Sequence, residues 1–391
     1  MKYTFSDNIN GLKPSAIREI LKLSAEPGII PFSAGNPSNE SFPVRQIQKI
    51  SKEILKKMPY EALQYSITEG YKPLRDFVLE NLGQEGLVFG DDEVIITSGA
   101  QQSINLTAKA LANSGDTVIC EEPSFIGSLN AFRSFSLNLV GVPIEKDGMN
   151  ISFLEEALKK NKNVRFIYTI PNFQNPSGVT MSLEKRKALY NLAREYNVII
   201  LEDNPYGALR FEGEEIPSIK SLDTDGRVIY AGSYSKVLAP GIRVGFAIAN
   251  KEIISKMTVC KQTDDVHTNL WAQIVAHKFL TEYNFDAHLK KIREIYRKKA
   301  KLCIDAIEKF LVSKGISFFD VSGGLFVWCR LPEGIDMNEF CMKALENKVA
   351  VVPGSAFLVD ETKKSDWFRI NYSTPTDEQI LKGIEILSKL L

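Results

Sequence analysis

The stretch SLEKRKALYNLAREYNVIILED, residues 182–203, decides the fold class because it joins an amphipathic helix directly to an apolar strand. Residues 184–196 repeat apolar side chains with the 3.6-residue period of a helix, and Ser182 precedes them as the expected N-cap. The run NVIIL that follows, residues 197–201, is almost continuously apolar, which is typical of a strand in a sheet covered on both faces. A helix that leads straight into a buried strand indicates an α/β protein.

Short apolar strands alternate with helices through most of the chain. We predict seven strands, at residues 94–97, 117–120, 137–142, 164–168, 198–201, 228–231 and 244–249. Strands that alternate with helices imply right-handed crossovers and a mostly parallel sheet. We therefore expect a large α/β domain with a mostly parallel seven-stranded sheet covered by helices.

The pattern changes after about residue 280, where strands and helices become fewer and alternate less regularly. We predict a long helix at 285–311, strands at 324–330, 349–352 and 367–370, and helices at 337–346 and from about Thr376. This pattern favours a small α+β domain formed from both chain ends. The expected division is an N-terminal segment at 1–43, with a helix around 15–24, that docks on the small domain, a large domain at 44–283 and a small domain at 284–391.

Composition excludes several classes of function. The 48 Lys and Arg residues balance 48 Asp and Glu residues, so charge gives no case for a nucleic-acid or membrane partner. The three histidines, His267, His277 and His288, lie on a stretch that we expect to be helical, about 15 Å apart along it, so we expect no metal site. Five dispersed cysteines and the lack of a secretory signal or membrane-spanning run favour a cytoplasmic protein.

The segment SYSKVLAPGIRVG, residues 233–245, follows the strand expected at 228–231. Doubly wound folds bind ligands at the carboxyl ends of their strands, so Lys236 is expected to point into a cleft. A lysine flanked by hydroxyl groups and followed by Arg243 suits an amine that forms a Schiff base beside a phosphate. Taken alone, Lys236 could equally be a solvated loop residue.

Three further turns carry polar side chains at strand ends. Asp203 could pair with a protonated ring nitrogen or simply form a turn, and Tyr206 could donate to a phenolate oxygen. Asn175, in the loop at residues 171–178, offers an amide donor or belongs to an ordinary Asn-Pro turn. The turn TSGAQQ, residues 97–102, could cradle a phosphate at a helix N-terminus, although many turns between a strand and a helix look alike.

Arg369 lies within the short apolar strand FRINY, residues 368–372. Arginine is rarely interior unless it is paired, so Arg369 is either an edge residue or a planar clamp for a carboxylate. A lysine nucleophile, a phosphate cradle, an acid for a ring nitrogen, a phenol and a carboxylate clamp are together the parts that pyridoxal phosphate and an amino acid require.

The ordered motifs GAQQ, FQNPSG, EDNPYG, SYSKVLAPGIRVGF and FRINYS resemble those of the class I/II aminotransferases of the fold-type I pyridoxal-phosphate superfamily. The resemblance runs from about Ile17 to the C-terminus. The segments ALQYSITEGYKPLR and PNFQNPSGVTMS are most similar to the branch of 2-aminoadipate, kynurenine and aromatic aminotransferases. The resemblance implies an enzyme that exchanges an amino group between an L-amino acid and a 2-oxo acid such as 2-oxoglutarate. The amino acid would be 2-aminoadipate or an aromatic amino acid, or the enzyme would have broad specificity.

The resemblance also implies roles for individual residues. Lys236 would hold the cofactor covalently and then carry the proton between the substrate and the cofactor, while Asp203 would keep the ring nitrogen protonated. Arg369 would pair with the substrate carboxylate. The remaining implied residues are Tyr206 and Asn175 at the ring oxygen; Gly99, Ala100, Gln101, Ser233, Ser235 and Arg243 at the phosphate; Asn175 and the backbone of Gly35 at the substrate; and Tyr65, which would reach the phosphate of a partner subunit in a homodimer.

Two positions depart from the family pattern. Phe125, in EPSFIG, stands where many relatives have tyrosine, so stacking on the ring is kept but the phenol is lost. Ala100 stands where many have serine, which leaves only its backbone N–H for the phosphate. Neither change touches Lys236, Asp203 or Arg369, so we expect activity to persist.

Two other functions compete with transamination. A C–S lyase of the same superfamily would use the same lysine and acid to eliminate across the Cα–Cβ bond. The effector domain of a MocR-type regulator has the same fold, but only about a dozen residues precede the first expected helix and the chain has no basic excess. Substrate choice stays open: residues 15–31 are mostly apolar, with Arg18 as their one arginine, and could cover the side-chain pocket or make ordinary core contacts.

Overall fold

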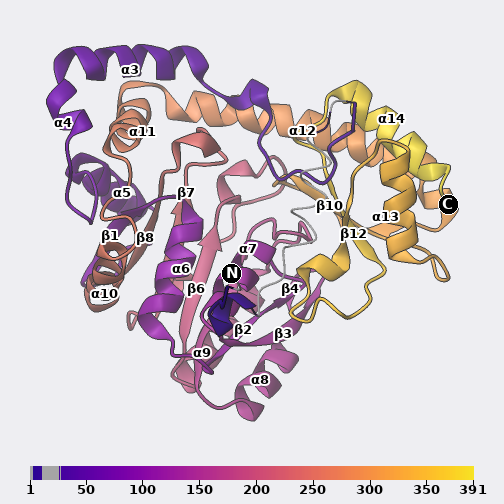
Figure 1. Ribbon diagram of the computed structural model, residues 1–391, viewed down its shortest axis with the longest axis horizontal. Helices are drawn as coiled ribbons and strands as arrows, with labels where there is room; N and C mark the ends of the chain where they lie inside the picture. The colour runs from indigo at the N-terminus through magenta and orange to yellow at the C-terminus, as the bar shows by residue number, and fades with distance from the viewer. Residues whose placement is uncertain (1–2, 11–25, 27) are drawn as a thin grey trace.

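The computed structural model describes residues 3–10, 26 and 28–391, which form a larger and a smaller part (Figure 1). The larger part is built on an eight-stranded sheet and the smaller part on a four-stranded sheet. Helix α12, Phe285–Phe310, runs across the top of Figure 1 from the larger part into the smaller one. The two-part α/β architecture predicted from the sequence is confirmed.

The large sheet has the strand order β1-β8-β7-β6-β5-β2-β3-β4. Its strands are β1 Asp92–Thr97, β2 Thr117–Glu122, β3 Asn138–Glu145, β4 Gly148–Met149, β5 Val164–Thr169, β6 Ile199–Asn204, β7 Val228–Ser233 and β8 Gly245–Asn250. The five strands from β3 to β7 along the sheet pair in parallel, whereas β8 is antiparallel to both β7 and β1. Each of the seven predicted strands is present, and the two-residue β4 adds an eighth at the edge, antiparallel to β3.

Helices cover the sheet as the alternating pattern predicts. Those of the larger part are α3 Val44–Lys57, α4 Pro59–Leu63, α5 Lys72–Gln84, α6 Ala100–Leu111, α7 Ile126–Ser134, α8 Ile151–Lys160, α9 Leu183–Glu195, α10 Lys251–Gln262 and α11 Leu270–Glu282, and the four-residue α1, Asp7–Asn10, lies near the chain start. Within the described ranges, no helix is both long and apolar enough to cross a membrane.

The stretch quoted first folds as its pattern requires. The Ser182 hydroxyl accepts the backbone N–H of Lys185 and caps α9, whose Leu189 is fully buried against the sheet. Strand β6 extends beyond the predicted Leu201 as far as Asn204, because its polar end stays paired with β7. The sheet therefore carries Asp203 on a rigid strand rather than on a turn.

The smaller part packs three helices and a sheet. Its strands are β9 Ser317–Phe318, β10 Phe326–Arg330, β11 Val352–Pro353 and β12 Trp367–Asn371, in the order β11-β12-β10-β9, and its helices are α12, α13 Met337–Glu346 and α14 Asp377–Ser388. The long helix and α13 match their predicted bounds closely, and Thr376 caps α14 through a capping box with Gln379.

Part of the N-terminal segment is bound to the smaller part. Ile30 bridges Val349 in parallel, and the backbone N–H of Asn371 donates to the carbonyl of Phe32 at 2.8 Å. Helix α1 instead contacts α7 of the larger part. The helix expected around residues 15–24 lies outside the described residues, and the domain boundaries at 43/44 and 283/284 stay predictions.

Candidate active site

The predicted catalytic residues gather at one edge of the large sheet. Asp203 lies at the end of β6, Asn175 in the loop after β5, and Lys236 in the turn after β7. These three strands are parallel neighbours, so their carboxyl ends meet at the same edge. Arg369 of β12 reaches the same place from the smaller part, where its guanidinium donates to Asn175 at 2.7 Å.

The amine of Lys236 lies between the two parts of the protein. It donates to the carbonyl oxygen of Gly35 at 2.8 Å and lies 6.0 Å from the ring centre of Tyr206. Burial, helped by the cations Arg369 and Arg243, lowers the pKa of Lys236 to about 8. A sizeable fraction of the amine is therefore neutral near physiological pH, and the neutral amine is the form that attacks a carbonyl carbon.

Asp203 is buried and only half satisfied. Its Oδ2 atom accepts the hydroxyl of Tyr168 at 2.8 Å, and that hydroxyl accepts in turn from Ser128 at 2.7 Å. Its Oδ1 atom is buried with no hydrogen-bond partner. Burial raises the pKa of Asp203 to about 7. A buried carboxylate oxygen without a donor is costly, so this atom suits an N–H group that a ligand brings.

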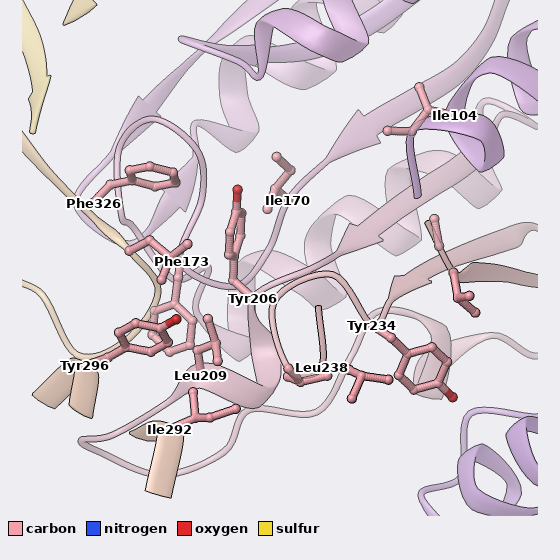
Figure 2. Close-up of a cluster of buried hydrophobic side chains, with 14 of the residues drawn as sticks. Ile104, Ile170, Phe173, Tyr206, Leu209, Tyr234, Leu238, Ile292, Tyr296 and Phe326 are labelled. Carbon is pink, nitrogen blue, oxygen red and sulfur yellow. The ribbon is translucent and has the colours of Figure 1, made fainter. Parts of the chain in front are cut away.

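Asn175 connects the phenol of Tyr206 with the guanidinium of Arg369. Its side-chain N–H donates to the Tyr206 hydroxyl at 3.4 Å, and its carbonyl oxygen accepts from Arg369 at 2.7 Å. Figure 2 shows Tyr206 with Phe326 on one side and Leu238, from the turn that carries Lys236, on the other. The Tyr206 and Phe326 rings meet edge to face at 5.8 Å, which fixes the phenol at the junction of the two parts.

Arg369 is buried without an acidic partner among the described residues. Besides Asn175, its guanidinium donates to the carbonyl of Ser33 at 2.8 Å, and its Nε atom has no partner. The guanidinium lies over the rings of Phe326 and Phe357, 4.3 and 5.1 Å from their centres. A buried guanidinium held by neutral groups is a ready receptor for a carboxylate.

The turn between β1 and α6 faces Arg243. Gly99 has a φ of 82°, and a Cβ atom there would lie 2.4 Å from a guanidinium nitrogen of Arg243. That guanidinium donates to the carbonyl of Ser98 at 2.9 Å and to the hydroxyl of Ser235 at 3.4 Å. Because Ala100 begins α6, free backbone N–H groups at the helix N-terminus lie beside a cation and a hydroxyl, which is a phosphate-binding arrangement.

Three other predicted residues lie around this turn. Gln101 donates to the carbonyl of Gly127 at 2.9 Å, and the ring of Phe125 lies against the same glycine. The Ser233 hydroxyl accepts the backbone N–H of Ser235 at 3.1 Å, so it shapes the turn that carries Lys236.

Tyr65 stands apart from this group. Its side chain is 81% exposed, and its ring meets His267 edge to face at 5.9 Å. Within one chain, the described structure records no contact of Tyr65 with the residues around Lys236. A role in the site therefore requires a second subunit.

Sequence reasoning missed Tyr168, the partner of Asp203, and Ser98, whose carbonyl holds Arg243. Tyr168 is an apolar-strand residue by pattern, and only the pairing of β5 with β6 brings its hydroxyl to Asp203. The expectation that the three histidines share one helical stretch was wrong. His267 precedes α11, and the other two lie on α11 and α12. In the described part of the chain no group of three His, Cys, Asp or Glu residues could hold a metal.

The geometry fits pyridoxal phosphate and an amino acid. Asp203 Oδ1 and Arg369 Nε are buried polar atoms without partners. The protonated ring nitrogen of the cofactor and a substrate carboxylate would supply the partners that they lack. The lack of a side chain at Gly99 lets the Arg243 guanidinium lie against the turn that begins α6. An amine, an acid, an anion cradle and a carboxylate receptor thus occur together in one site.

Comparison with known proteins agrees with this geometry. Residues 27–387 match the family model described as aminotransferase class I and II. The chain is 40% identical to aromatic-amino-acid aminotransferase 1 of Thermococcus litoralis, over 99% of this chain and 94% of that protein. It is 37% identical to the 2-aminoadipate transaminase of Thermus thermophilus, over 99% of this chain and 96% of that protein.

The fold has a close match among solved structures. The kynurenine aminotransferase of Pyrococcus horikoshii, solved in complex with PMP, superposes with a TM-score of 0.95 at 37% identity, covering 99% of this chain and 96% of that one. The prediction of a pyridoxal-phosphate-dependent aminotransferase is confirmed, and the chain belongs to the class I and II aminotransferases.

Proposed function

We propose that the enzyme transfers the amino group of aromatic amino acids and 2-aminoadipate to 2-oxoglutarate, with Lys236 as the catalytic residue. The single observation that carries the roles is that Lys236, Asp203 and Arg369, distant in sequence, meet around one site with unpartnered polar atoms. The names of relatives that share 37–40% of their residues with this chain support the substrate range. The aromatic rings of Phe326 and Phe357 beside Arg369 also favour an apolar substrate side chain.

The protein's own groups divide the work of catalysis. Bound pyridoxal phosphate supplies an electron sink for the charge left when the substrate loses its α-proton. Lys236 would hold the cofactor covalently, and its amine would take and return the proton that moves during the amino transfer. Asp203, oriented by the hydrogen bond from Tyr168, would keep the ring nitrogen of the cofactor protonated.

Binding and orientation fall to the surrounding residues. Arg369 pairs with the substrate carboxylate, and Asn175 fixes the plane of its guanidinium. Tyr206 and Asn175 would donate to the ring oxygen. The phosphate would be held by Gly99, Ala100, Gln101, Ser233, Ser235 and Arg243, and Phe125 would stack on the ring.

The active form is a homodimer in this proposal. Large apolar side chains are exposed on α4 and the loop that follows: Tyr60 is 89% exposed, Leu63 73%, Tyr65 81% and Ile67 53%. Several large apolar side chains exposed along one short segment favour burial against a second copy. Light scattering should give about twice the chain mass of 43.8 kDa, and a monomer at micromolar concentration would contradict the proposal.

A cytoplasmic location is also proposed. All five cysteines are free thiols, which favours a reducing compartment. Recovery of the native protein in a membrane or extracellular fraction would contradict this location.

A panel of amino donors tests the reaction. L-Tyrosine, L-kynurenine, L-2-aminoadipate and L-aspartate would each be mixed with 2-oxoglutarate and the cofactor-loaded enzyme, and glutamate formation measured. We expect turnover with the first three and none with the Lys236→Ala variant. Release of pyruvate from L-cystathionine without any oxo acid would instead indicate a C–S lyase. Full transamination by Lys236→Ala would overturn the assignment of the catalytic lysine.

A further inference from the structure

Glu121 is a buried carboxylate with no cation beside it. It lies near the end of β2, is 2% exposed, and no lysine or arginine of the described chain pairs with it. Burial raises the pKa of Glu121 to about 7. An unpaired buried carboxylate lowers the free energy of unfolding. We therefore expect Glu121 to have a role other than stabilising the core.

The side-chain hydrogen bonds of Glu121 go to residues 169–174, the segment that leads into the site. One oxygen accepts the hydroxyl of Thr169 at 2.7 Å. The other accepts the backbone N–H of Ile170 at 3.1 Å and the side-chain N–H of Gln174 at 3.2 Å. The carboxylate thereby joins the end of β5 to the loop beyond it.

Gln174 extends this hydrogen-bond network through the loop that carries Asn175. Its side-chain N–H also donates to the carbonyl of Pro123 at 2.8 Å, and its side-chain carbonyl accepts from the backbone N–H of Ser177 at 2.9 Å and from the Ser177 hydroxyl at 2.7 Å. These bonds close the loop on both sides of Asn175. The loop also holds Phe173 at a φ of 48°, which is unusual for a bulky side chain and persists only where the surroundings enforce it.

Asn175 makes contacts that tolerate little displacement. Its side-chain amide is hydrogen-bonded both to Arg369, the proposed substrate clamp, at 2.7 Å and to the Tyr206 hydroxyl at 3.4 Å. Arg369 belongs to the smaller part of the protein and Tyr206 to the larger part. If the loop moved by a few tenths of an ångström, both contacts would change together. Hydrogen bonds weaken steeply beyond their normal length.

We propose that Glu121 is a positioning residue for transamination, which acts through Gln174 to set Asn175 against Arg369 and Tyr206. The inference rests on the proposed roles of Asn175, Arg369 and Tyr206. It assigns Glu121 no contact with substrate or cofactor. Its prediction is that loss of the carboxylate disturbs carboxylate binding and the electronic state of the bound cofactor together.

Glu202 offers a matched control. It is a fully buried carboxylate near the end of β6, and it also accepts three hydrogen bonds from a following segment: from the Ser218 hydroxyl at 2.7 Å, and from the backbone N–H groups of Ile219 at 3.1 Å and Lys220 at 2.7 Å. That segment carries none of the proposed site residues. Glu202→Ala therefore removes a buried carboxylate with the same number of hydrogen bonds, made to a loop outside the site, although Arg186 lies near Glu202 and no cation of the described residues lies near Glu121.

The experiment compares Glu121→Ala, Glu121→Gln, Gln174→Leu and Glu202→Ala as cofactor-loaded enzymes, with Arg369→Ala as the test of the clamp itself. Three quantities would be measured: the KM for L-tyrosine, the dissociation constant of 3-phenylpropionate, which has a carboxylate but no amino group, and the midpoint of the pH titration of the cofactor's visible absorbance. Thermal unfolding of the cofactor-free proteins would report the cost to the fold. Gln174→Leu cuts the link at its other end, so the test survives if Glu121→Ala does not fold.

We expect Glu121→Ala and Gln174→Leu to raise both the KM and the dissociation constant about tenfold and to shift the titration midpoint. Glu121→Gln should bring the KM and the dissociation constant most of the way back to the wild-type values, because its side-chain carbonyl can still accept from Ile170 and Gln174. Glu202→Ala should unfold at a lower temperature with the three site quantities unchanged. If Glu121→Ala and Gln174→Leu lower only the unfolding temperature, the positioning role is wrong. If Arg369→Ala leaves 3-phenylpropionate binding intact, the proposed clamp fails, and the inference fails with it.

Discussion

The amine of Lys236 donates a hydrogen bond to the carbonyl oxygen of Gly35, 2.8 Å away in space and 201 positions away in the chain. The carbonyl favours the protonated amine, whereas burial and the cations Arg369 and Arg243 favour the neutral one. Burial and the cations outweigh the carbonyl, since the pKa of Lys236 falls to about 8. The N-terminal segment thus supplies an acceptor to the Lys236 amine, while burial and the neighbouring cations keep a fraction of that amine neutral.

The first prediction concerns the pH dependence of cofactor capture. Because the pKa of Lys236 is lowered from 10.5 to about 8, the neutral amine accumulates as pH rises through 8. The rate at which cofactor-free protein binds pyridoxal phosphate, followed by absorbance, should rise through that region and then level off. Lys236→Ala should not form the covalent species at any pH. A rate that keeps rising steeply up to pH 10 would mean that the amine has an ordinary pKa.

The second prediction concerns Asp203. The pKa of its carboxyl is raised from 3.8 to about 7 in the folded protein by burial. The unfolded protein therefore releases this proton first, and the free energy of unfolding falls as the pH rises from 3.8 to 7. Asp203→Asn should therefore stabilise the cofactor-free protein by about 2–4 kcal/mol above pH 7 and hardly at all below pH 4. The same variant should lower kcat by about a hundredfold or more. Urea unfolding at the two pH values, with kinetics at pH 7.5, tests both parts, and equal stability at pH 7.5 would contradict the assigned shift.

The third prediction concerns the phosphate turn. Gly99→Ala adds a Cβ atom 2.4 Å from the Arg243 guanidinium at a residue whose φ is 82°. Strain at such a position should weaken cofactor binding about tenfold. Gly241→Ala is the control, because a Cβ atom there meets nothing within 4 Å. Equilibrium dialysis of pyridoxal phosphate would compare the two, and equal affinities would argue against the turn as the phosphate site.

The fourth prediction tests whether Tyr65 serves the neighbouring subunit. Lys236→Ala and Tyr65→Ala proteins would be mixed, dissociated in mild denaturant and reassembled. If Tyr65 acts across the interface, each mixed dimer has one intact site, and about a quarter of wild-type activity should appear. Each variant reassembled alone is the control. No gain over the average of the two controls would mean that Tyr65 acts within its own chain or not at all.

Prediction from the sequence was most accurate for elements that are long enough for their pattern of apolar residues to be recognised. Apolar runs located seven strands of the large sheet, and α13 was predicted with its observed bounds, because each contains a full period of buried residues. Strands β4 and β9 have two residues each and contain no period to detect. The reversed direction of β8 was also not visible, since direction depends on the connection and not on the strand's own residues.

The candidate site shows the same limit. Lys236, Asp203 and Arg369 were identified from motifs, because each is a polar residue within an apolar strand or in the turn that follows one. The roles of Tyr168 and Glu121 depend on strand order, since β2, β5 and β6 must be neighbours before these side chains can reach Asp203 and the Asn175 loop. Pairing order is a property of the whole sheet, and no single segment encodes it.

The bond between Arg369 and the carbonyl of Ser33 has a consequence for how the enzyme is made. These two residues are 336 positions apart, so the ribosome completes Ser33 on the order of tens of seconds before it reaches Arg369. Until then the Ser33 carbonyl lacks this donor. All the strands of the large sheet end by Asn250, so they are synthesised before β12. If Arg369 binds the substrate carboxylate as proposed, an unfinished chain that stops short of β12 lacks its receptor for the substrate.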